Sequence, residues 1–244
     1  MSTPLPSKLL TSINVAKAMT LTLKHMWLVP KGNPPREVIA KFAKEWAREL
    51  LEAFNIKVEV TGEAPPWGVL HAANHRSFMD ILVLMYATPG TFLSKAEVAK
   101  WPIIGAAAKL AGTVFVRRDI KDSRLAARET LRELLQSGDS VTVFPEGTTR
   151  SIEDPLVFKY GSFEVTAETG SSVVPIAIEY PRVDDAWINN EPIGQYYHRV
   201  YNRPMTVQVR IGPIMTGEDG PELAEKAQKW VNDQLQDMHE QLHK

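Results

Sequence analysis

A histidine and an aspartate five positions apart, His75 and Asp80, lie in a polar cluster directly after the apolar run 67–72. Within one regular helix this offset places two side chains about 140° apart, so the pair can meet only if His75 precedes a helix that contains Asp80. Asn74 or Ser77 as the N-cap of that helix permits this geometry. A carboxylate on one imidazole nitrogen fixes the tautomer, and the other nitrogen can then take a proton from a hydroxyl group. The cluster therefore predicts a general base.

Two other interpretations of this cluster stay open. His75 can be a buried structural histidine, or His71, His75 and Asp80 can be metal ligands. The metal interpretation is the weaker one, because two histidines four positions apart share a face only on a helix, whereas His71 belongs to the apolar strand. The chain also has no cysteine and no Gly-x-Ser-x-Gly sequence, so a covalent acyl-enzyme has no obvious nucleophile. We therefore predict no metal and no bound cofactor.

A second polar cluster, residues 144–151, follows another apolar run. Gly147 lets the backbone approach a ligand closely, and Glu146, Thr148 and Arg150 add a carboxylate, a hydroxyl and a guanidinium group. Amides, hydroxyls and a guanidinium group in one loop suit a phosphate or carboxylate ligand. The alternative is a Pro-Glu-Gly turn with solvated polar side chains.

A third segment, residues 112–118, is an apolar strand that ends in Arg117 and Arg118. Arginine pairs are usually surface residues, but here the pair accompanies a base candidate and a glycine-containing loop. All of them follow strands, where an α/β sheet binds its ligands. The combination predicts an anion-binding site beside the general base.

Strand and helix patterns alternate along the chain, which predicts an α/β fold: a largely parallel sheet covered by helices, with an N-terminal helical hairpin. We expect residues 1–55 to form a membrane-associating hairpin and residues 56–244 to form the α/β domain. The predicted strands are residues 56–61, 67–72, 91–94, 113–116, 141–144, 173–178 and 205–211. The predicted helices of the second part are residues 78–87, 103–111, 123–135, 163–169 and 221–243.

The N-terminal segment is basic and amphipathic, and residues 1–36 contain no acidic residue. One face of its predicted helix is apolar and consists of Leu9, Ile13, Ala16, Leu23 and Trp27. Lys17 and Lys24 interrupt the apolar run well short of the roughly 18 residues that a membrane span needs. The pattern favours an interfacial helix at an anionic membrane surface, and an ordinary helix docked on the core is the alternative. The net charge of −1 gives no indication of a nucleic-acid partner.

These motifs resemble the four sequence blocks of the glycerolipid acyltransferase family, which includes lysophosphatidate and glycerol-3-phosphate acyltransferases, over residues 69–178. The matching residues are Asn74, His75 and Asp80 for the first block, Gly112, Phe115 and Arg118 for the second, residues 144–151 for the third, and Val174, Pro175 and Ile176 for the fourth. In addition, Lys159 resembles a lysine that follows the third block, and Lys95 resembles one found between the first two. The third block departs from the family pattern because Thr149 separates Thr148 from Arg150.

The resemblance implies an O-acyltransferase that moves a fatty acyl chain from acyl-CoA or acyl carrier protein to the free hydroxyl of 1-acylglycerol-3-phosphate, giving phosphatidic acid. It implies that His75 is the general base, oriented by Asp80, and that Gly147 and neighbouring amides stabilise the oxyanion. The substrate-binding residues that it implies are Lys95, Arg118, Glu146, Gly147, Thr148, Arg150 and Lys159. The partners are then the lysophospholipid, the acyl thioester, a membrane surface and acyl carrier protein, at the cytoplasmic face of the membrane as a peripheral or monotopic protein.

Three rival functions follow from the same residues. Variants with two threonines in the third block occur among relatives that acylate lysophosphatidate and among relatives that acylate lyso-ornithine lipid, so another lysolipid is an alternative acceptor. A metal-dependent lipid hydrolase would use His71, His75 and Asp80. An inactive phospholipid-binding protein is the non-enzymatic alternative, although the intact His75, Asp80 and Glu146 argue against it.

Overall fold

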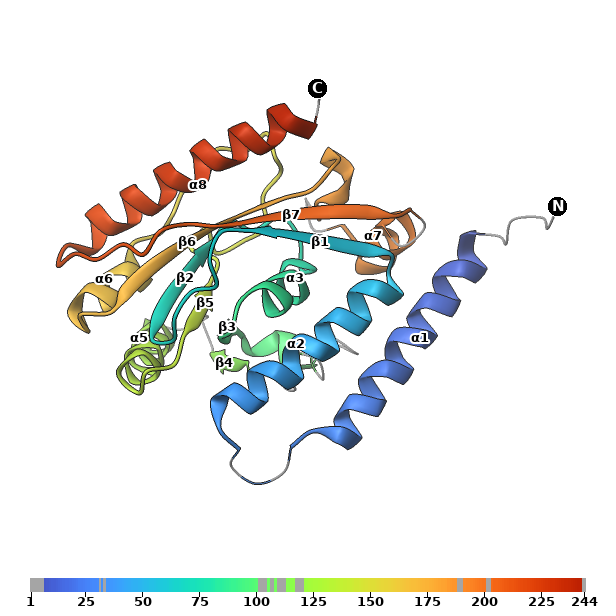
Figure 1. The fold of residues 1–244 in the computed structure, drawn as a ribbon, viewed down its shortest axis with the longest axis horizontal. Helices are drawn as coiled ribbons and strands as arrows, with labels where there is room; N and C mark the ends of the chain where they lie inside the picture. The colour runs from blue at the N-terminus through green and yellow to red at the C-terminus, as the bar shows by residue number, and fades with distance from the viewer. Residues whose placement is uncertain are drawn as a thin grey trace.

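A seven-stranded sheet in the order β1-β7-β6-β2-β5-β3-β4 forms the centre of the molecule (Figure 1). The computed structural model describes residues 7–30, 32, 34–100, 105, 108, 113–116, 121–187, 191–200 and 203–242. The strands are β1 (Ile56–Thr61), β2 (Val69–Ala73), β3 (Thr91–Lys95), β4 (Val114–Val116), β5 (Val141–Val143), β6 (Ser172–Glu179) and β7 (Met205–Ile211). Each of these strands overlaps a strand predicted from the apolar runs.

The sheet is largely parallel, as the sequence predicts. Strands β6, β2, β5, β3 and β4 are joined by parallel pairing, as are β1 and β7. The exception is the antiparallel pair β6 and β7, in which Ile176 lies opposite Ile211. The carboxyl ends of β2, β5, β3, β4 and β6 therefore lie along the same edge of the sheet, where the polar clusters of the sequence follow these strands.

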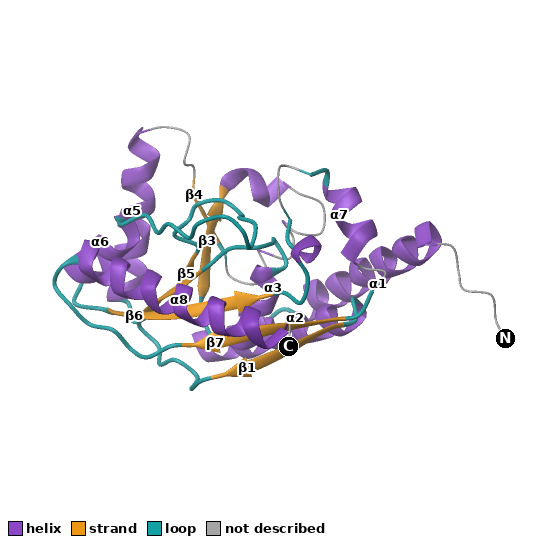
Figure 2. Ribbon diagram, turned by 90° about the horizontal axis from the view of Figure 1, so that it is seen from above, coloured by secondary structure: helices purple, strands orange, loops and turns teal. Residues whose placement is uncertain are grey.

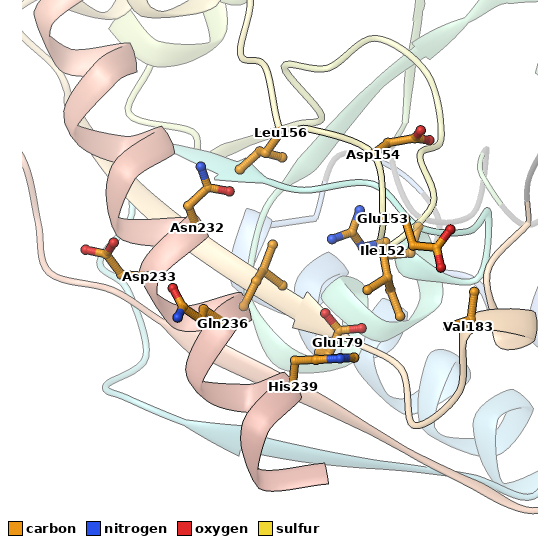
Figure 3. Close-up of a pocket in the computed structure, with 12 residues that line it drawn as sticks. Ile152, Glu153, Asp154, Leu156, Glu179, Val183, Asn232, Asp233, Gln236 and His239 are labelled. Carbon is orange, nitrogen blue, oxygen red and sulfur yellow. The ribbon is translucent and has the colours of Figure 1, made fainter. Parts of the chain in front are cut away.

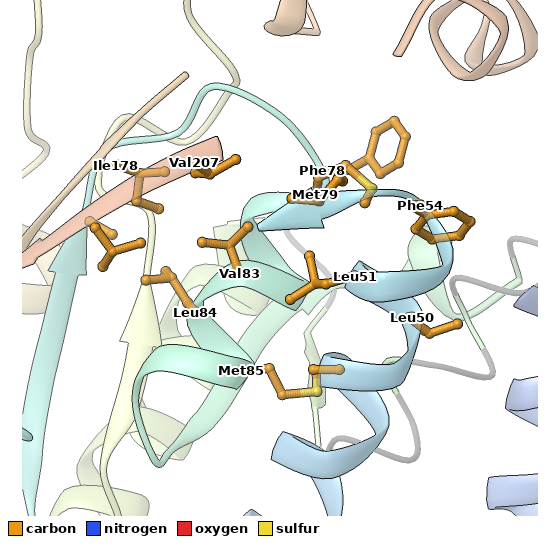
Figure 4. Close-up of a cluster of buried hydrophobic side chains, with 14 of the residues drawn as sticks. Leu50, Leu51, Phe54, Phe78, Met79, Val83, Leu84, Met85, Ile178 and Val207 are labelled. Carbon is orange, nitrogen blue, oxygen red and sulfur yellow. The ribbon is translucent and has the colours of Figure 1, made fainter. Parts of the chain in front are cut away.

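Helices cover both faces of the sheet (Figures 1 and 2). Side chains on one face, such as Ile176 and Ile178, pack with α2 (Arg36–Ala53), α3 (Asp80–Ala87) and α7 (Ile193–Val200). Figure 4 shows part of this cluster, with Leu51, Val83 and Ile178 pointing toward one another. On the opposite face Val173 and Ala177 pack with α5 (Lys121–Gln136), α6 (Gly161–Glu168) and α8 (Gly220–Leu242). Both faces of the central strands are therefore buried, which explains their continuous apolar sequences.

The first two helices form the predicted helical hairpin, with α1 (Ser7–Leu28) packed against α2 and α7. The side of α1 that faces the protein is mainly polar and comprises Asn14, Ala18, Thr22 and His25. The apolar side points outward: Ile13 is 45% exposed, Leu23 62% and Trp27 82%. This arrangement is the opposite of a helix docked on the core through its apolar face.

Three differences from the predicted elements have physical reasons or lie outside the described residues. The helix expected over residues 78–87 begins at Asp80, because residues 74–79 form the loop that Asp80 holds. Helix α7 was not predicted, and the helix expected over residues 103–111 lies mostly outside the described residues. The division into two domains at residue 55 stays a prediction, although α2 contributes Trp46 and Leu50 to the same core cluster as the sheet. Among the described helices, none is both long and apolar enough to cross a membrane.

Candidate active site

The loop between β2 and α3 positions the first polar cluster at the carboxyl edge of the sheet. Asn74 fixes the start of this loop to β6, because its side-chain amide donates to the carbonyl oxygen of Ile178 at 2.9 Å and its side-chain oxygen accepts from the N–H of Ile178 at 2.8 Å. The next residue, His75, donates its backbone N–H to Oε1 of Glu146 at 2.7 Å. Strand β6 and the loop after β5 therefore hold the backbone at Asn74 and His75 in place.

His75 and Asp80 meet as their spacing predicts, with 2.9 Å between Nδ1 and Oδ2. Asp80 is fully buried, and its Oδ2 also accepts the backbone N–H groups of Arg76 at 2.7 Å and Ser77 at 2.8 Å. The prediction of Asn74 or Ser77 as the N-cap of α3 is wrong: the N-cap is Met79, which makes no side-chain cap. Asp80 itself, in the first turn, reaches back to the loop amides instead.

The imidazole ring of His75 lies flat against Phe144, with ring centroids 3.9 Å apart and an angle of 12° between the planes. Its side chain is 17% exposed. Because Asp80 occupies Nδ1, the remaining nitrogen, Nε2, is the one that can exchange a proton with another molecule. An imidazole held in this way by a buried carboxylate has the geometry that a general base requires.

Glu146 joins the second polar cluster to the first. Its Oε1 accepts the N–H of His75, while Oε2 is buried without a hydrogen-bond partner among the described residues. Burial raises the pKa of the Glu146 carboxyl to about 6, although the hydrogen bond from His75 and the charge of Arg76 act in the opposite direction. On the other side of the loop, the N–H of Arg150 donates to the carbonyl oxygen of His75 at 2.8 Å.

Gly147 and Lys159 lie in contact within the same loop region. Gly147 has a φ of +76°, and a Cβ atom there would lie 2.5 Å from Nζ of Lys159. The N–H of Lys159 donates to the carbonyl oxygen of Pro145 at 3.1 Å. The N–H of Gly147 donates to the carbonyl oxygen of Phe144 at 3.0 Å. The expectation that the Gly147 amide serves an oxyanion therefore does not fit, because a turn inside the protein already uses this donor.

For the remaining predicted site residues the structure gives only the backbone position or the exposure, or does not describe them. Thr148 is exposed and Arg150 half-buried, both in the loop after β5. Lys95 is the last residue of β3, at the same edge of the sheet as His75, but its side chain is outside the described part of the structure. Arg118 lies outside the described residues altogether, two residues after the end of β4.

Two residues of the site have no signal in the motif spacing. The hydroxyl of Tyr180, the residue that follows β6, donates to Oδ1 of Asp80 at 2.6 Å. Arg76 is buried, and its Nη1 donates to the carbonyl oxygen of Ser151 at 2.7 Å. A polar residue directly after a buried strand was the available signal for Tyr180, and it resembles the signal that identified His75.

A cavity of about 720 Å³ lies on the α8 side of this region (Figure 3). Its lining includes Arg76, Glu179, Asp154, Gln236 and His239. The buried carboxyl of Glu179 has a pKa raised to about 7 by burial, which the nearby charge of Arg76 partly offsets. Arg76 lines this cavity, whereas its neighbour His75 is not among the described lining residues.

The three residues predicted as alternative metal ligands, His71, His75 and Asp80, are not arranged around one site. Nδ1 of His71 forms a hydrogen bond with Oγ1 of Thr142 at 3.1 Å, within the sheet, whereas His75 is paired with Asp80 in the loop. Within the described ranges, no group of three or more acidic, histidine or cysteine side chains is arranged to hold a metal ion.

Several known proteins that resemble this chain are acyltransferases. The model of the acyltransferase family matches residues 56–179. A lyso-ornithine lipid O-acyltransferase of Pseudomonas aeruginosa is 38% identical over 230 residues, which cover 91% of this chain and 88% of that protein. A 1-acyl-sn-glycerol-3-phosphate acyltransferase of Neisseria meningitidis serogroup B is 37% identical over 138 residues, 56% of this chain and 54% of that protein.

A solved structure has the same fold. The 1-acyl-sn-glycerophosphate acyltransferase PlsC from Thermotoga maritima superposes with a TM-score of 0.70 at 22% sequence identity, over 95% of each chain. At this identity the likeness concerns the fold, including the largely parallel sheet and the N-terminal helical pair.

Proposed function

The chain belongs to the acyltransferase family, and we propose that it transfers a fatty acyl chain from a thioester carrier to the free hydroxyl of a lysolipid. The main acceptor that we propose is 1-acylglycerol-3-phosphate. The observation on which the proposal rests is the pair of His75 and Asp80, with 2.9 Å between Nδ1 and Oδ2. A hydroxyl is a weak nucleophile until a base removes its proton, and a buried carboxylate that holds an imidazole supplies such a base.

The reaction proceeds by direct attack. Nε2 of His75 takes the proton of the acceptor hydroxyl while the hydroxyl oxygen forms a bond to the thioester carbonyl carbon. Asp80 stabilises the imidazolium that results. The tetrahedral intermediate then collapses, the carbon–sulfur bond breaks, and the leaving thiolate takes the proton from Nε2. An ester and a free thiol are produced, and His75 is again a base.

Charged side chains near the loop after β5 bind the two anionic groups of the reaction, the oxyanion of the thioester and the phosphate of the acceptor. Lys159, whose Nζ lies against Gly147, is placed to neutralise charge that develops on the thioester oxygen, in place of the Gly147 amide. Arg118, with Lys95 and Arg150, holds the phosphate of the acceptor; an arginine fork is the preferred partner for a phosphate. Glu146 contributes by fixing the backbone of His75. Acyltransferases of this family generally need no metal cofactor, and acyl-CoA or acyl carrier protein acts as co-substrate.

A specific observation favours a second acceptor, lyso-ornithine lipid. The Pseudomonas aeruginosa enzyme named for that acceptor matches 91% of this chain, whereas the Neisseria meningitidis enzyme matches 56% at nearly the same identity. Thr149, which departs from the common form of the third block, is compatible with either acceptor.

An acceptor panel with the full-length protein tests the function. The protein is incubated in detergent micelles with a fatty acyl-CoA or an acylated carrier protein and equal concentrations of 1-acylglycerol-3-phosphate, lyso-ornithine lipid and lysophosphatidylethanolamine. Mass spectrometry then identifies the product. We expect phosphatidic acid to form fastest; faster formation of ornithine lipid would assign the second acceptor. A folded protein that acylates none of the three with either donor would contradict the proposed function.

We further propose that α1 attaches the protein to the cytoplasmic face of the membrane. Leu23 and Trp27 on the outer side of α1 are 62% and 82% exposed, and Met19 and Met26 are each 47% exposed. A helix with this apolar side and the exposed Lys17 suits an anionic bilayer surface. The lysolipid acceptor resides in the same bilayer, and an interfacial helix would hold the site close to it.

A further inference from the structure

The carboxylate of Asp80 is held by hydrogen-bond donors on both of its oxygens. Oδ2 accepts from His75, Arg76 and Ser77 at distances of 2.7 to 2.9 Å. Oδ1 accepts from the hydroxyl of Tyr180 at 2.6 Å. The first three donors belong to the loop directly before Asp80, whereas Tyr180 is 100 residues further along the chain. The hydrogen bond from Tyr180 therefore links the catalytic loop to the end of β6.

The hydroxyl of Tyr180 stays protonated, and so remains a donor, at neutral pH. It is 1% exposed, and burial together with the charge of Asp80 raises the pKa of its hydroxyl well above the ordinary value of 10.0. A phenol that stays neutral has one proton to donate, and the short distance to Oδ1 shows which acceptor receives it.

We propose that Tyr180 is a positioning residue that sets both the orientation and the basicity of His75. This inference rests on the acyl transfer proposed above. With Oδ1 held by Tyr180, the carboxylate of Asp80 cannot rotate freely, so Oδ2 stays in line with Nδ1 of His75. The same hydrogen bond draws negative charge toward Oδ1, and Oδ2 then attracts the imidazolium proton less strongly.

Other charged or titratable groups also face this pair. They are Arg76 on the same loop, Glu146 from the loop after β5, Glu179 at the end of β6, and Tyr196 from α7. None of them is altered by replacing Tyr180 with phenylalanine. A change in the pKa of His75 in such a variant therefore reports the lost hydrogen bond.

The test compares Tyr180→Phe with Tyr196→Phe in the full-length protein. Tyr196 is a matched control, because its buried hydroxyl bonds with Ser77 at 2.7 Å and with the carbonyl oxygen of Asp185 at 3.0 Å instead of with Asp80. The pKa of His75 is measured by NMR titration of protein labelled with ¹³C-histidine, and the His75 signal is assigned by its loss in His75→Gln. The pH dependence of kcat/KM is measured in parallel.

We expect the His75 signal to titrate at higher pH in Tyr180→Phe than in the wild type, and the acidic limb of the pH profile to move to higher pH by the same amount. Loss of a hydrogen bond to a charged group should also lower kcat about tenfold to a hundredfold. Tyr196→Phe should lower the unfolding temperature to a similar degree without moving the pKa of His75.

Two results would overturn the inference: an unchanged pKa of His75 in folded Tyr180→Phe, or an equal shift in both variants, which would indicate general loosening of the loop. The NMR titration requires no substrate. It therefore decides the role of Tyr180 even if the protein acylates no lysolipid, an outcome that would contradict the proposed function separately.

Discussion

At the scale of single residues, the positive φ of Gly147 explains why the loop after β5 requires glycine at this position, and the side chain of Lys159 lies against it. A Cβ atom at Gly147 would lie 2.5 Å from Nζ of Lys159, and the backbone there has a φ of +76°. A side chain would therefore be strained and would also displace the ammonium group. Gly170 has a similar φ of +67°, but no atom lies within 4 Å of its would-be Cβ.

This pair of glycines gives a matched test. We expect Gly147→Ala and Gly170→Ala each to lower stability by about 1–3 kcal/mol, the usual cost of a non-glycine residue in this conformation. Turnover per folded molecule should fall about tenfold to a hundredfold in Gly147→Ala, because a small misplacement of a charged group is costly in a reacting complex. It should stay near the wild-type value in Gly170→Ala. Equal turnover of the two variants would show that the position of Lys159 does not matter.

The residues that the sequence reveals are those whose partners lie nearby in the chain. His75 and Asp80 could be paired because a spacing of five positions across a helix start has one geometric solution. The clamp by Glu146 and the hydrogen bond from Tyr180 could not be foreseen, because they join segments 71 and 100 residues apart. The choice of cap also failed, because the side chain of Asn74 pairs with the backbone of β6 and helix α3 begins at Asp80, whose side chain bonds back to the loop amides.

At the scale of elements, α1 reverses the usual pattern of a surface helix. Its small and polar side chains, among them Ala18 and Thr22, face α2 and α7, while Leu23 and Trp27 face outward. The hydroxyl of Thr22 is satisfied within the helix by the carbonyl oxygen of Ala18 at 2.8 Å, so a polar inner side requires no further partner there. Exposed apolar surfaces of this kind are typical of membrane or protein interaction sites, which supports the membrane attachment proposed for α1.

We expect the double substitution Leu23→Gln and Trp27→Gln to weaken binding to vesicles that contain phosphatidylglycerol by at least about tenfold, because each buried apolar side chain contributes about 1.5–3 kcal/mol. Sedimentation with vesicles measures the effect. Leu125→Gln is the control, since Leu125 on α5 is 63% exposed, close to the 62% of Leu23. Undiminished binding by the double variant would assign attachment to another surface.

Charge reversal separates the electrostatic part of this attachment. Lys24 forms an ion pair with Glu49 of α2 at 2.9 Å, so its replacement would also disturb the hairpin. Lys17→Glu is therefore the cleaner change, and its effect should shrink as salt is added.

The strands with a regular burial pattern are among the elements that could be predicted from the sequence. Strand β6 is buried over Val173–Glu179 on both faces and reads as a continuous apolar run, whereas β7 alternates between buried and half-buried positions. Both patterns are distinctive. Helix α7 has eight residues and a sequence with aromatic, basic and amide side chains, and short helices of this kind owe their existence to tertiary packing, here of Tyr196 and Val200.

At the scale of the whole molecule, the buried His71 links the stability of the sheet to pH. Burial lowers the pKa of His71 from 6.5 to about 3. Below pH 6.5, His71 binds a proton in the unfolded chain but not in the folded protein. The contribution of His71 to the free energy of unfolding is therefore fully present above pH 6.5 and is lost as the pH falls toward 3. The expected slope is about 1.4 kcal/mol per pH unit.

Urea unfolding of the wild type and of His71→Asn measures the pH-dependent contribution of His71 to the free energy of unfolding. We expect the variant to be less stable at pH 7, and the difference to narrow by about 2 kcal/mol at pH 5. Glu179→Gln supplies a control of opposite sign: the pKa of Glu179 is raised to about 7, so its contribution is present below pH 4.5 and is lost as the pH rises through 7. A difference between wild type and His71→Asn that does not change with pH would contradict the assignment.

The proposed acyl transfer requires His75 as its base, and the turnover of His75→Ala in the full-length protein measures this role. The predicted result is a loss of turnover of about 10²-fold to 10⁴-fold, the range for removal of a general base, with an unfolding temperature close to that of the wild type. Turnover within a few-fold of wild type, or a loss explained entirely by unfolding, would contradict the role of His75 as the general base.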